Sequence, residues 1–185
     1  MDGQELFKHF ALYGILASWL LGAWLSFRTK NEDKKTTSGL ATTNRTNYFI
    51  FGLALTVGAV SLALCAFGYL KKYTDLPGIF YNLLVFCLIL QLVTAWVSDT
   101  KGWKHTVHYF AAWVMSYLLL SLGGILLAST GSTWLQASGL VLLVAMAFAG
   151  TYAGRPGGTN KQFLRSQQLY FVLFQLLLLA WIYAS

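Results

Sequence analysis

Long apolar stretches alternate with short polar segments along the whole chain. Asp, Glu, Lys and Arg are absent from 9–27, 46–70, 76–98, 105–154 and 166–185. A helix needs about 20 apolar residues to cross the roughly 30 Å of hydrocarbon in a bilayer. The longest run is about twice that length, and the polar segment 129–133 divides it. The pattern therefore predicts six membrane-spanning helices, at about 6–27, 47–70, 78–98, 105–128, 134–152 and 166–184.

Composition supports a membrane protein. The chain has 185 residues, of which 57% are hydrophobic and only 10% are charged, whereas a soluble domain carries about 25% charged residues. A soluble enzyme, a disordered tail and a disulfide-rich secreted scaffold are therefore excluded. Open strands are excluded because their backbone groups would be unpaired in lipid, and the apolar runs are too long for barrel strands. We expect an all-α polytopic membrane protein, with one transmembrane domain over 1–185.

The positive charges predict an orientation. Ten of the 13 Lys and Arg residues fall in the loops after the first, third and fifth predicted helices, and the other three, Lys8, Lys71 and Lys72, lie on the opposite side. Cytoplasmic loops are enriched in Lys and Arg. We therefore expect both termini outside and the basic loops in the cytoplasm. This rule and attraction to anionic headgroups explain the net charge of +7, so we expect lipid contacts and no nucleic-acid binding.

Small residues predict where helices pack. Gly14, Ser18 and Gly22 recur at four-residue spacing in the first helix, and a second stripe of small residues passes through Gly58 in the next. Helix association in lipid relies on such close approach. We therefore expect these stripes to form helix–helix seams, and Gly58→Leu to push helices apart. Trp19 lies deep in the first span, where we expect it to fill space between helices.

One dense polar cluster joins the third and fourth predicted helices. His105 and His108 are three residues apart in the first turn of the fourth helix, and Asp99 lies six residues before His105. One interpretation is a capped helix start with two hydrated histidines, because carboxylates are favoured near a helix N-terminus. A second is an open metal site, since His and Asp are metal ligands. A third is recognition of a headgroup or anion. We expect no bound metal.

The predicted spans contain amides, but no Asp, Glu, Lys or Arg lies in the middle of a span. Gln91 and Gln175 lie inside the third and sixth helices, where they either cross-link helices or line a polar cavity for a neutral or lipidic ligand. Cys65 and Cys87 are expected to be small apolar fillers. Haem and other cofactors are not expected, because His9 and the other two histidines, His105 and His108, start helices at opposite faces, roughly 25–30 Å apart.

The segment between the third and fourth helices resembles a known family. Trp96-Val97-Ser98-Asp99, followed by His105 and His108, is similar to small bacterial membrane proteins of the domain-of-unknown-function 998 family, and the similarity covers about 25 residues around these two helices. Where that family has Phe-Pro before the Asp, this chain has Val97-Ser98. The resemblance implies a bacterial membrane protein of similar size and helix count, and it implies no activity.

These observations favour a binding protein over an enzyme. We expect an integral protein of the bacterial plasma membrane that binds a lipid or small apolar ligand, or that is a subunit of a membrane complex or a homo-oligomer. The candidate ligand-binding residues are Asp99, His105, His108, Gln91 and Gln175. The alternative is a membrane-embedded, metal-dependent hydrolase or lipid-modifying enzyme that uses Asp99, His105 and His108.

Overall fold

The part of the chain that the structure describes forms six long helices, as the sequence predicts. The computed structural model describes residues 3–28, 36–42, 44–98, 102–153 and 160–184. Within these residues the structure is all-helical, and six helices have the length and hydropathy of membrane spans, which indicates a multi-pass membrane protein. The helices are α1 (Gly3–Arg28), the short α2 (Thr37–Ala41), α3 (Arg45–Cys65) with its continuation through the π-helical turn η1 (Ala66–Leu70) and α4 (Lys71–Tyr73), α5 (Gly78–Trp96), α6 (Trp103–Ala128), α7 (Thr133–Ala153) and α8 (Asn160–Ala184).

Local residues fix where several helices begin. The Asn44 side chain accepts a hydrogen bond from the Asn47 amide at 2.8 Å, which satisfies one of the unpaired donors at the start of α3. Pro77 directly precedes α5, where its missing N–H costs no helical bond. Gly102 precedes α6 with a φ of 81°, a left-handed conformation that glycine adopts without steric cost.

The short helix α2 was not predicted, because its five residues are too few to show a helical period. Thr36 caps it, since the Thr36 hydroxyl accepts from the Gly39 amide at 2.8 Å. Leu40 and Ala41 are almost fully buried, and Ala41 belongs to a small apolar cluster with Leu21 and Phe51. α2 therefore packs one end of α1 onto α3, in a segment that the sequence indicated only as a polar loop.

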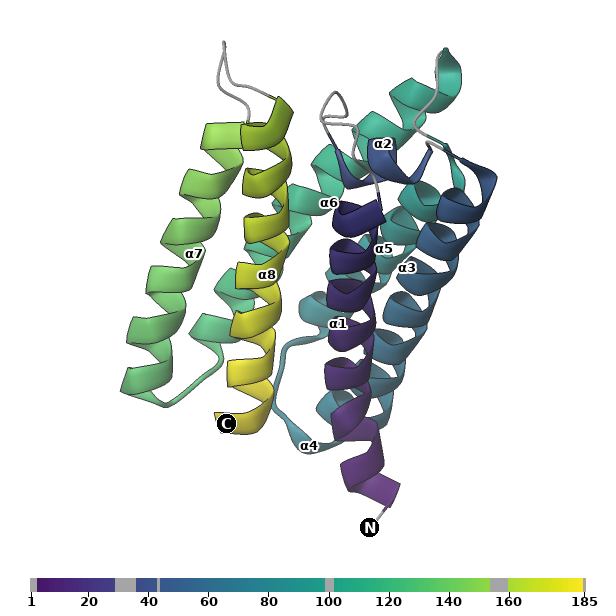
Figure 1. The fold of residues 1–185 in the computed structure, drawn as a ribbon. Helices are drawn as coiled ribbons and strands as arrows, with labels where there is room; N and C mark the ends of the chain where they lie inside the picture. Colours follow the sequence, from purple (N-terminus) through teal and green to yellow (C-terminus); the bar gives the residue numbers. More distant parts are fainter. Residues whose placement is uncertain (1–2, 29–35, 43, 99–101, 154–159, 185) are drawn as a thin grey trace.

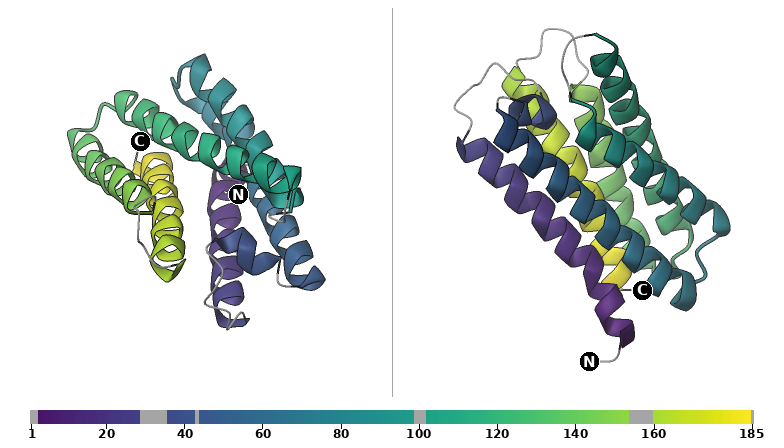
Figure 2. Two further views of the ribbon diagram at one scale, coloured as in Figure 1. Left: turned by 90° about the horizontal axis from the view of Figure 1, so that it is seen from above. Right: turned by 90° about the vertical axis from the view of Figure 1, so that its right-hand side faces the viewer.

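Consecutive long helices run up and down and pack on one another (Figure 1). α1 packs chiefly on α3, and α7 packs chiefly on α8. Seen from above, α7 and α8 form a pair on one side, α1 and α3 lie on the other, and α6 connects the two sides (Figure 2). α8 returns beside α1 and contacts it at few residues. The fold therefore leaves a thin seam between the first and last helices.

Small residues allow the closest helix crossings. A Cβ atom added at Gly14 would lie 3.0 Å from the Ser61 Cβ and 3.2 Å from the Gly58 carbonyl oxygen. Gly123 and Gly139 similarly receive leucine side chains from neighbouring helices. The first two predicted seams therefore meet each other at Gly14 and Gly58, whereas nothing lies within 4 Å of a Cβ added at Gly22.

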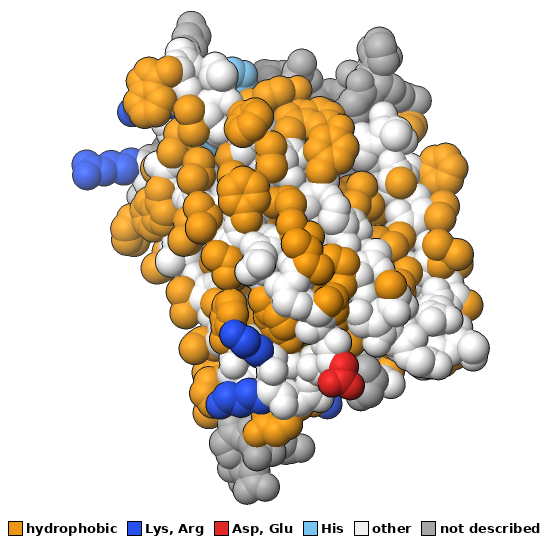
Figure 3. Space-filling model, turned by 180° about the vertical axis from the view of Figure 1, so that it is seen from behind, with side chains coloured by type: hydrophobic (Ala, Val, Ile, Leu, Met, Phe, Trp, Pro, Cys, Tyr) orange, Lys and Arg blue, Asp and Glu red, His pale blue; other side chains and the backbone are white. Residues whose placement is uncertain are grey.

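The outer surface is broadly apolar. Large hydrophobic side chains such as Leu20, Val141 and Phe148 are about two-thirds or more exposed, and Figure 3 shows hydrophobic side chains over the middle of one face with charged residues towards its ends. In water this surface would be strongly unfavourable. It matches the hydrocarbon of a bilayer, which agrees with the six predicted spans.

Candidate ligand-binding cavity

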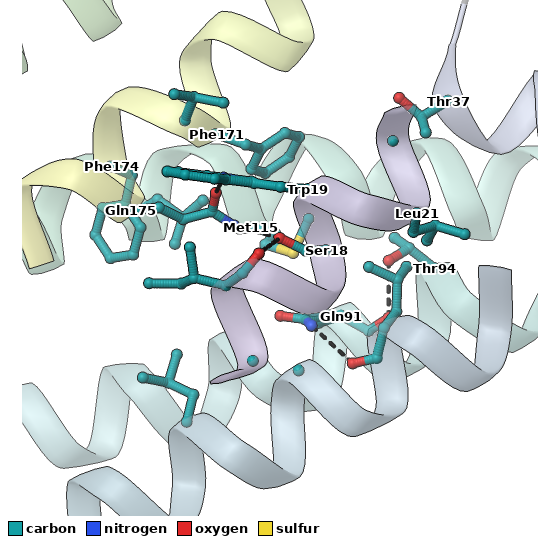
Figure 4. Close-up of a pocket in the computed structure, with 18 of the residues that line it drawn as sticks. Ser18, Trp19, Leu21, Thr37, Gln91, Thr94, Met115, Phe171, Phe174 and Gln175 are labelled. Carbon is teal, nitrogen blue, oxygen red and sulfur yellow. Dashed lines mark hydrogen bonds between the residues drawn. The ribbon is translucent and has the colours of Figure 1, made fainter. Parts of the chain in front are cut away.

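A cavity of about 450 Å³ lies inside the bundle, within the range of roughly 300–1,000 Å³ that is typical of small-molecule sites. Its walls come from α1, α3, α5, α6 and α8, and Thr37 and Ser38 of α2 lie at one end (Figure 4). Three of the five predicted ligand-binding residues line it: Gln91, Gln175 and His108. Residues from distant parts of the sequence are thus brought around one space.

Gln175 ties α8 to α1 across the seam. Its side-chain oxygen accepts from the Trp19 indole N–H at 2.6 Å, and its side-chain nitrogen donates to the Ser18 hydroxyl at 3.0 Å. Ser18 in turn donates to the Ile15 carbonyl at 2.8 Å. Figure 4 shows Trp19 reaching from α1 to Gln175. Both ends of the Gln175 amide are therefore used within the protein, as the cross-linking interpretation predicts.

Gln91 projects from α5 and uses only one end of its amide. Its nitrogen donates to the Leu55 carbonyl on α3 at 2.9 Å. Because a carbonyl only accepts, the nitrogen must face Leu55 and the Gln91 Oε1 must face the other way. No donor among the described residues pairs with this oxygen, and Gln91 lines the cavity. The Gln91 Oε1 is therefore an acceptor presented to the cavity.

His108 lies at the end of the cavity near α2. It is only 6% exposed, and its Nδ1 lies 2.7 Å from the Val97 carbonyl oxygen, just beyond the end of α5. The carbonyl accepts, so Nδ1 carries a hydrogen, and no described residue pairs with Nε2. This bond also satisfies a carbonyl that the end of a helix leaves without a helical partner.

The structure separates the two histidines that the sequence placed together. His105 is exposed, does not line the cavity, and stacks on Tyr109 with 6.1 Å between ring centroids. Asp99, the third member of the predicted cluster, lies outside the described residues. Among the side chains that the structure describes, no group of three or more His, Cys, Asp or Glu is placed to hold a metal ion. A cluster that includes Asp99 stays a prediction.

The cavity is polar at one end and apolar at the other. His108 and Leu119 mark its extent along α6, and their separation of eleven residues corresponds to about 16 Å of helix. Thr94, Gln167 and Gln168 join His108 at the end near α2, Gln91 and Gln175 lie at mid-depth, and the far end is lined by Ala11, Leu62, Leu84, Leu119 and Leu178. The described lining residues include no Asp, Glu, Lys or Arg.

Sequence reasoning missed several lining residues. Ser18 was interpreted as part of a packing seam and Trp19 as a space filler, but both contribute to the polar link to Gln175. Gly22 borders open cavity instead of a helix. The available signal was that Gly22 follows Ser18 by four residues and Trp19 by three, a spacing that packing seams and cavity walls share.

Comparison with known proteins gives no further assignment. No family model, no curated protein and no solved structure matches this chain.

Proposed function

We propose that this protein binds a lipid or another small apolar ligand from the bilayer in the cavity between α1, α3, α5, α6 and α8. The observation that carries the proposal is the cavity of about 450 Å³, which combines a polar end with an apolar end inside a membrane-type bundle. A cavity graded in this way is complementary to an amphiphile, which has a polar head and an apolar chain.

The seam between α1 and α8 supports exchange with the membrane. Trp19 lines the cavity and is 37% exposed, and its neighbour Ala23 also lines the cavity and is exposed. The cavity therefore reaches the lipid-facing surface beside α1. Few contacts join α1 to α8 there, so a small separation of the two helices would admit a chain from the bilayer.

The length of the cavity also fits a lipid chain. Its extent of about 16 Å along α6 is close to half of the roughly 30 Å hydrocarbon thickness, which is the depth of one leaflet.

The proposal also covers the orientation, the location and the partners of the protein. The helix ends near α2 adjoin the loops with most of the basic residues, so the polar end of the cavity would face the cytoplasm and both termini would face outward. We place the protein in the plasma membrane, with lipids and either a further membrane subunit or a second copy of the chain as its partners. Membership of the domain-of-unknown-function 998 family remains a proposal from the residues around Asp99.

Photolabelling tests the proposal. A long-chain alcohol that carries a diazirine on its chain would be added to the protein in bilayer nanodiscs, irradiated, and located by mass spectrometry. We expect saturable labelling of peptides that contain cavity residues such as Met115 and Leu88. Labelling confined to outward-facing residues such as Phe148, with none in the cavity, would contradict the proposal.

A matched pair of variants separates the cavity from the lipid surface. A Cβ added at Gly22 or at Gly124 meets nothing within 4 Å, but only Gly22 borders the cavity. Gly22→Leu should fill the cavity and abolish saturable labelling, whereas Gly124→Leu should preserve it. Equal labelling of the two variants would show that the cavity is not the site.

A further inference from the structure

We infer that the cavity takes an uncharged lipid whose head bears hydroxyl groups, the chemistry of a monoacylglycerol, with Gln91 and His108 as hydrogen-bond acceptors for that head. This inference rests on the proposed function and specifies its ligand class. Among the described residues, the cavity presents acceptors that no protein donor pairs with, and its lining carries no formal charge.

Gln91 supplies the deeper acceptor. The Leu55 carbonyl fixes the orientation of the amide through a 2.9 Å bond, so rotation of the side-chain amide cannot present its nitrogen to the cavity without breaking that bond. An acceptor in an apolar space is costly to leave unpaired. A ligand that donates a hydrogen bond to the Gln91 Oε1 relieves this cost, and a ligand that only accepts does not.

His108 supplies the second acceptor at the polar end. The Val97 carbonyl accepts the Nδ1 hydrogen at 2.7 Å, and the tautomer with its single hydrogen on Nδ1 has its lone pair on Nε2. No described residue donates to Nε2, and His108 lines the cavity. The cavity therefore offers two acceptors at different depths, which favours a head with more than one hydroxyl.

Donors at the same end suit a hydroxyl head as well. Gln167 accepts from the Thr37 amide at 3.3 Å through its Oε1, which leaves its amide N–H groups to donate. Gln168 lines the cavity beside it. A hydroxyl both donates and accepts, so it can pair with His108 and with these amides together.

Charge argues against an anionic head. An ionised phosphate or carboxylate loses much hydration energy when it is buried and needs a cation in return. The described lining residues provide neither Lys nor Arg. A glycerol head without phosphate needs no such cation, so the described part of the cavity suits it as it stands.

Competition for the photolabel tests the inference. Three lipids with the same acyl chain would compete with the diazirine alcohol at equal mole fraction in the bilayer: monolauroylglycerol, the same lipid with both hydroxyls methylated, and its phosphate monoester. We expect monolauroylglycerol to compete about tenfold better than the methylated lipid, a factor equivalent to roughly 1.4 kcal/mol of net hydrogen bonding. The phosphate monoester should be the weaker competitor as well.

Two glutamine variants test whether Gln91 causes the preference for hydroxyls over methyl ethers. Gln91→Met removes the presented acceptor, so the preference for hydroxyls over methyl ethers should fall to within about twofold. Gln136→Met removes an amide that does not line the cavity and donates to the Thr130 carbonyl at 2.9 Å, so it should retain the preference. The comparison of the three lipids in the wild-type protein tests the inference even if neither variant folds.

The outcomes separate this inference from the proposed function. If the label does not saturate at all, the proposed function itself fails. If it saturates and the methylated lipid or the phosphate monoester competes as well as monolauroylglycerol, ligand binding stands and the hydroxyl inference is overturned. An unchanged preference in Gln91→Met would overturn the role of Gln91.

Discussion

Replacing Gly14 by Ala should weaken the crossing of α1 and α3. The added Cβ would lie 3.0 Å from the Ser61 Cβ and 3.2 and 3.4 Å from the Gly58 carbonyl oxygen and Cα. The Gly58 atoms belong to the backbone and the Ser61 Cβ is attached directly to it, so none can rotate away. The two helices must therefore separate by a few tenths of an ångström, and overpacking of this kind costs about 1–3 kcal/mol.

Gly22→Ala is the matched control on the same helix. Both substitutions replace glycine by alanine inside α1, and both gain about 1 kcal/mol of helix propensity. Nothing lies within 4 Å of the added Cβ at Gly22. The difference between the two variants therefore isolates the packing cost.

Unfolding in mixed detergent micelles with increasing dodecyl sulfate measures that difference. Circular dichroism and tryptophan fluorescence would follow the transition. We expect Gly14→Ala to be less stable than Gly22→Ala by about 1–3 kcal/mol, with Gly22→Ala at or above the wild type. Equal stability of the two variants would refute the close crossing at Gly14.

Two further predictions concern the histidines and the topology. His108→Ala should destabilise the protein by about 1–3 kcal/mol, because the Val97 carbonyl loses its donor. His105 is exposed, so His105→Ala should shift stability by less than about 0.5 kcal/mol. Unfolding in detergent measures both variants, and equal effects would contradict the buried placement of His108. A reporter fused to the C-terminus should be active only outside the cytoplasm, as the basic loops predict, and activity restricted to the cytoplasm would reverse the proposed orientation.

The six spans could be predicted because charge is so costly in hydrocarbon. The same signal misplaced some helix ends. α8 begins at Asn160 instead of 166, and α3 continues to Tyr73 through Lys71 and Lys72, because a helix can extend past the hydrocarbon into water. α5 ends two residues early, at Trp96, where Val97 turns to an extended conformation and offers its carbonyl to His108.

The site was only partly predictable. Gln91 and Gln175 were identified because amides are few within the spans, but their different roles depend on partners far away in the sequence, such as Trp19, 156 residues from Gln175. His105 and His108 differ by three residues, which leaves a rotation of about 60° around the helix. That rotation is enough to bury one ring and expose the other, and hydropathy does not reveal which.

The small-residue stripes predicted which helices pack together, but they did not predict at which residue the contact is closest. Gly58 was expected to lie in a helix–helix seam, where Gly58→Leu would push the helices apart. A Cβ there would meet the Gln91 nitrogen at 3.5 Å and the Gly14 carbonyl at 3.7 Å, which are ordinary contacts, and Gly58 also borders the cavity. At the same crossing, a Cβ added at Gly14 on α1 would have closer contacts, at 3.0 and 3.2 Å. A single sequence shows which faces are small, but it does not show which atom of the partner helix lies opposite.

Electron cryomicroscopy of the protein in nanodiscs that contain monolauroylglycerol tests the central claim most directly. The account predicts elongated density in the cavity between α1 and α8, with its polar end within hydrogen-bonding distance of the Gln91 Oε1 or the His108 Nε2. A cavity closed by contact between α8 and α1, with no density beyond the protein's own side chains, would contradict it.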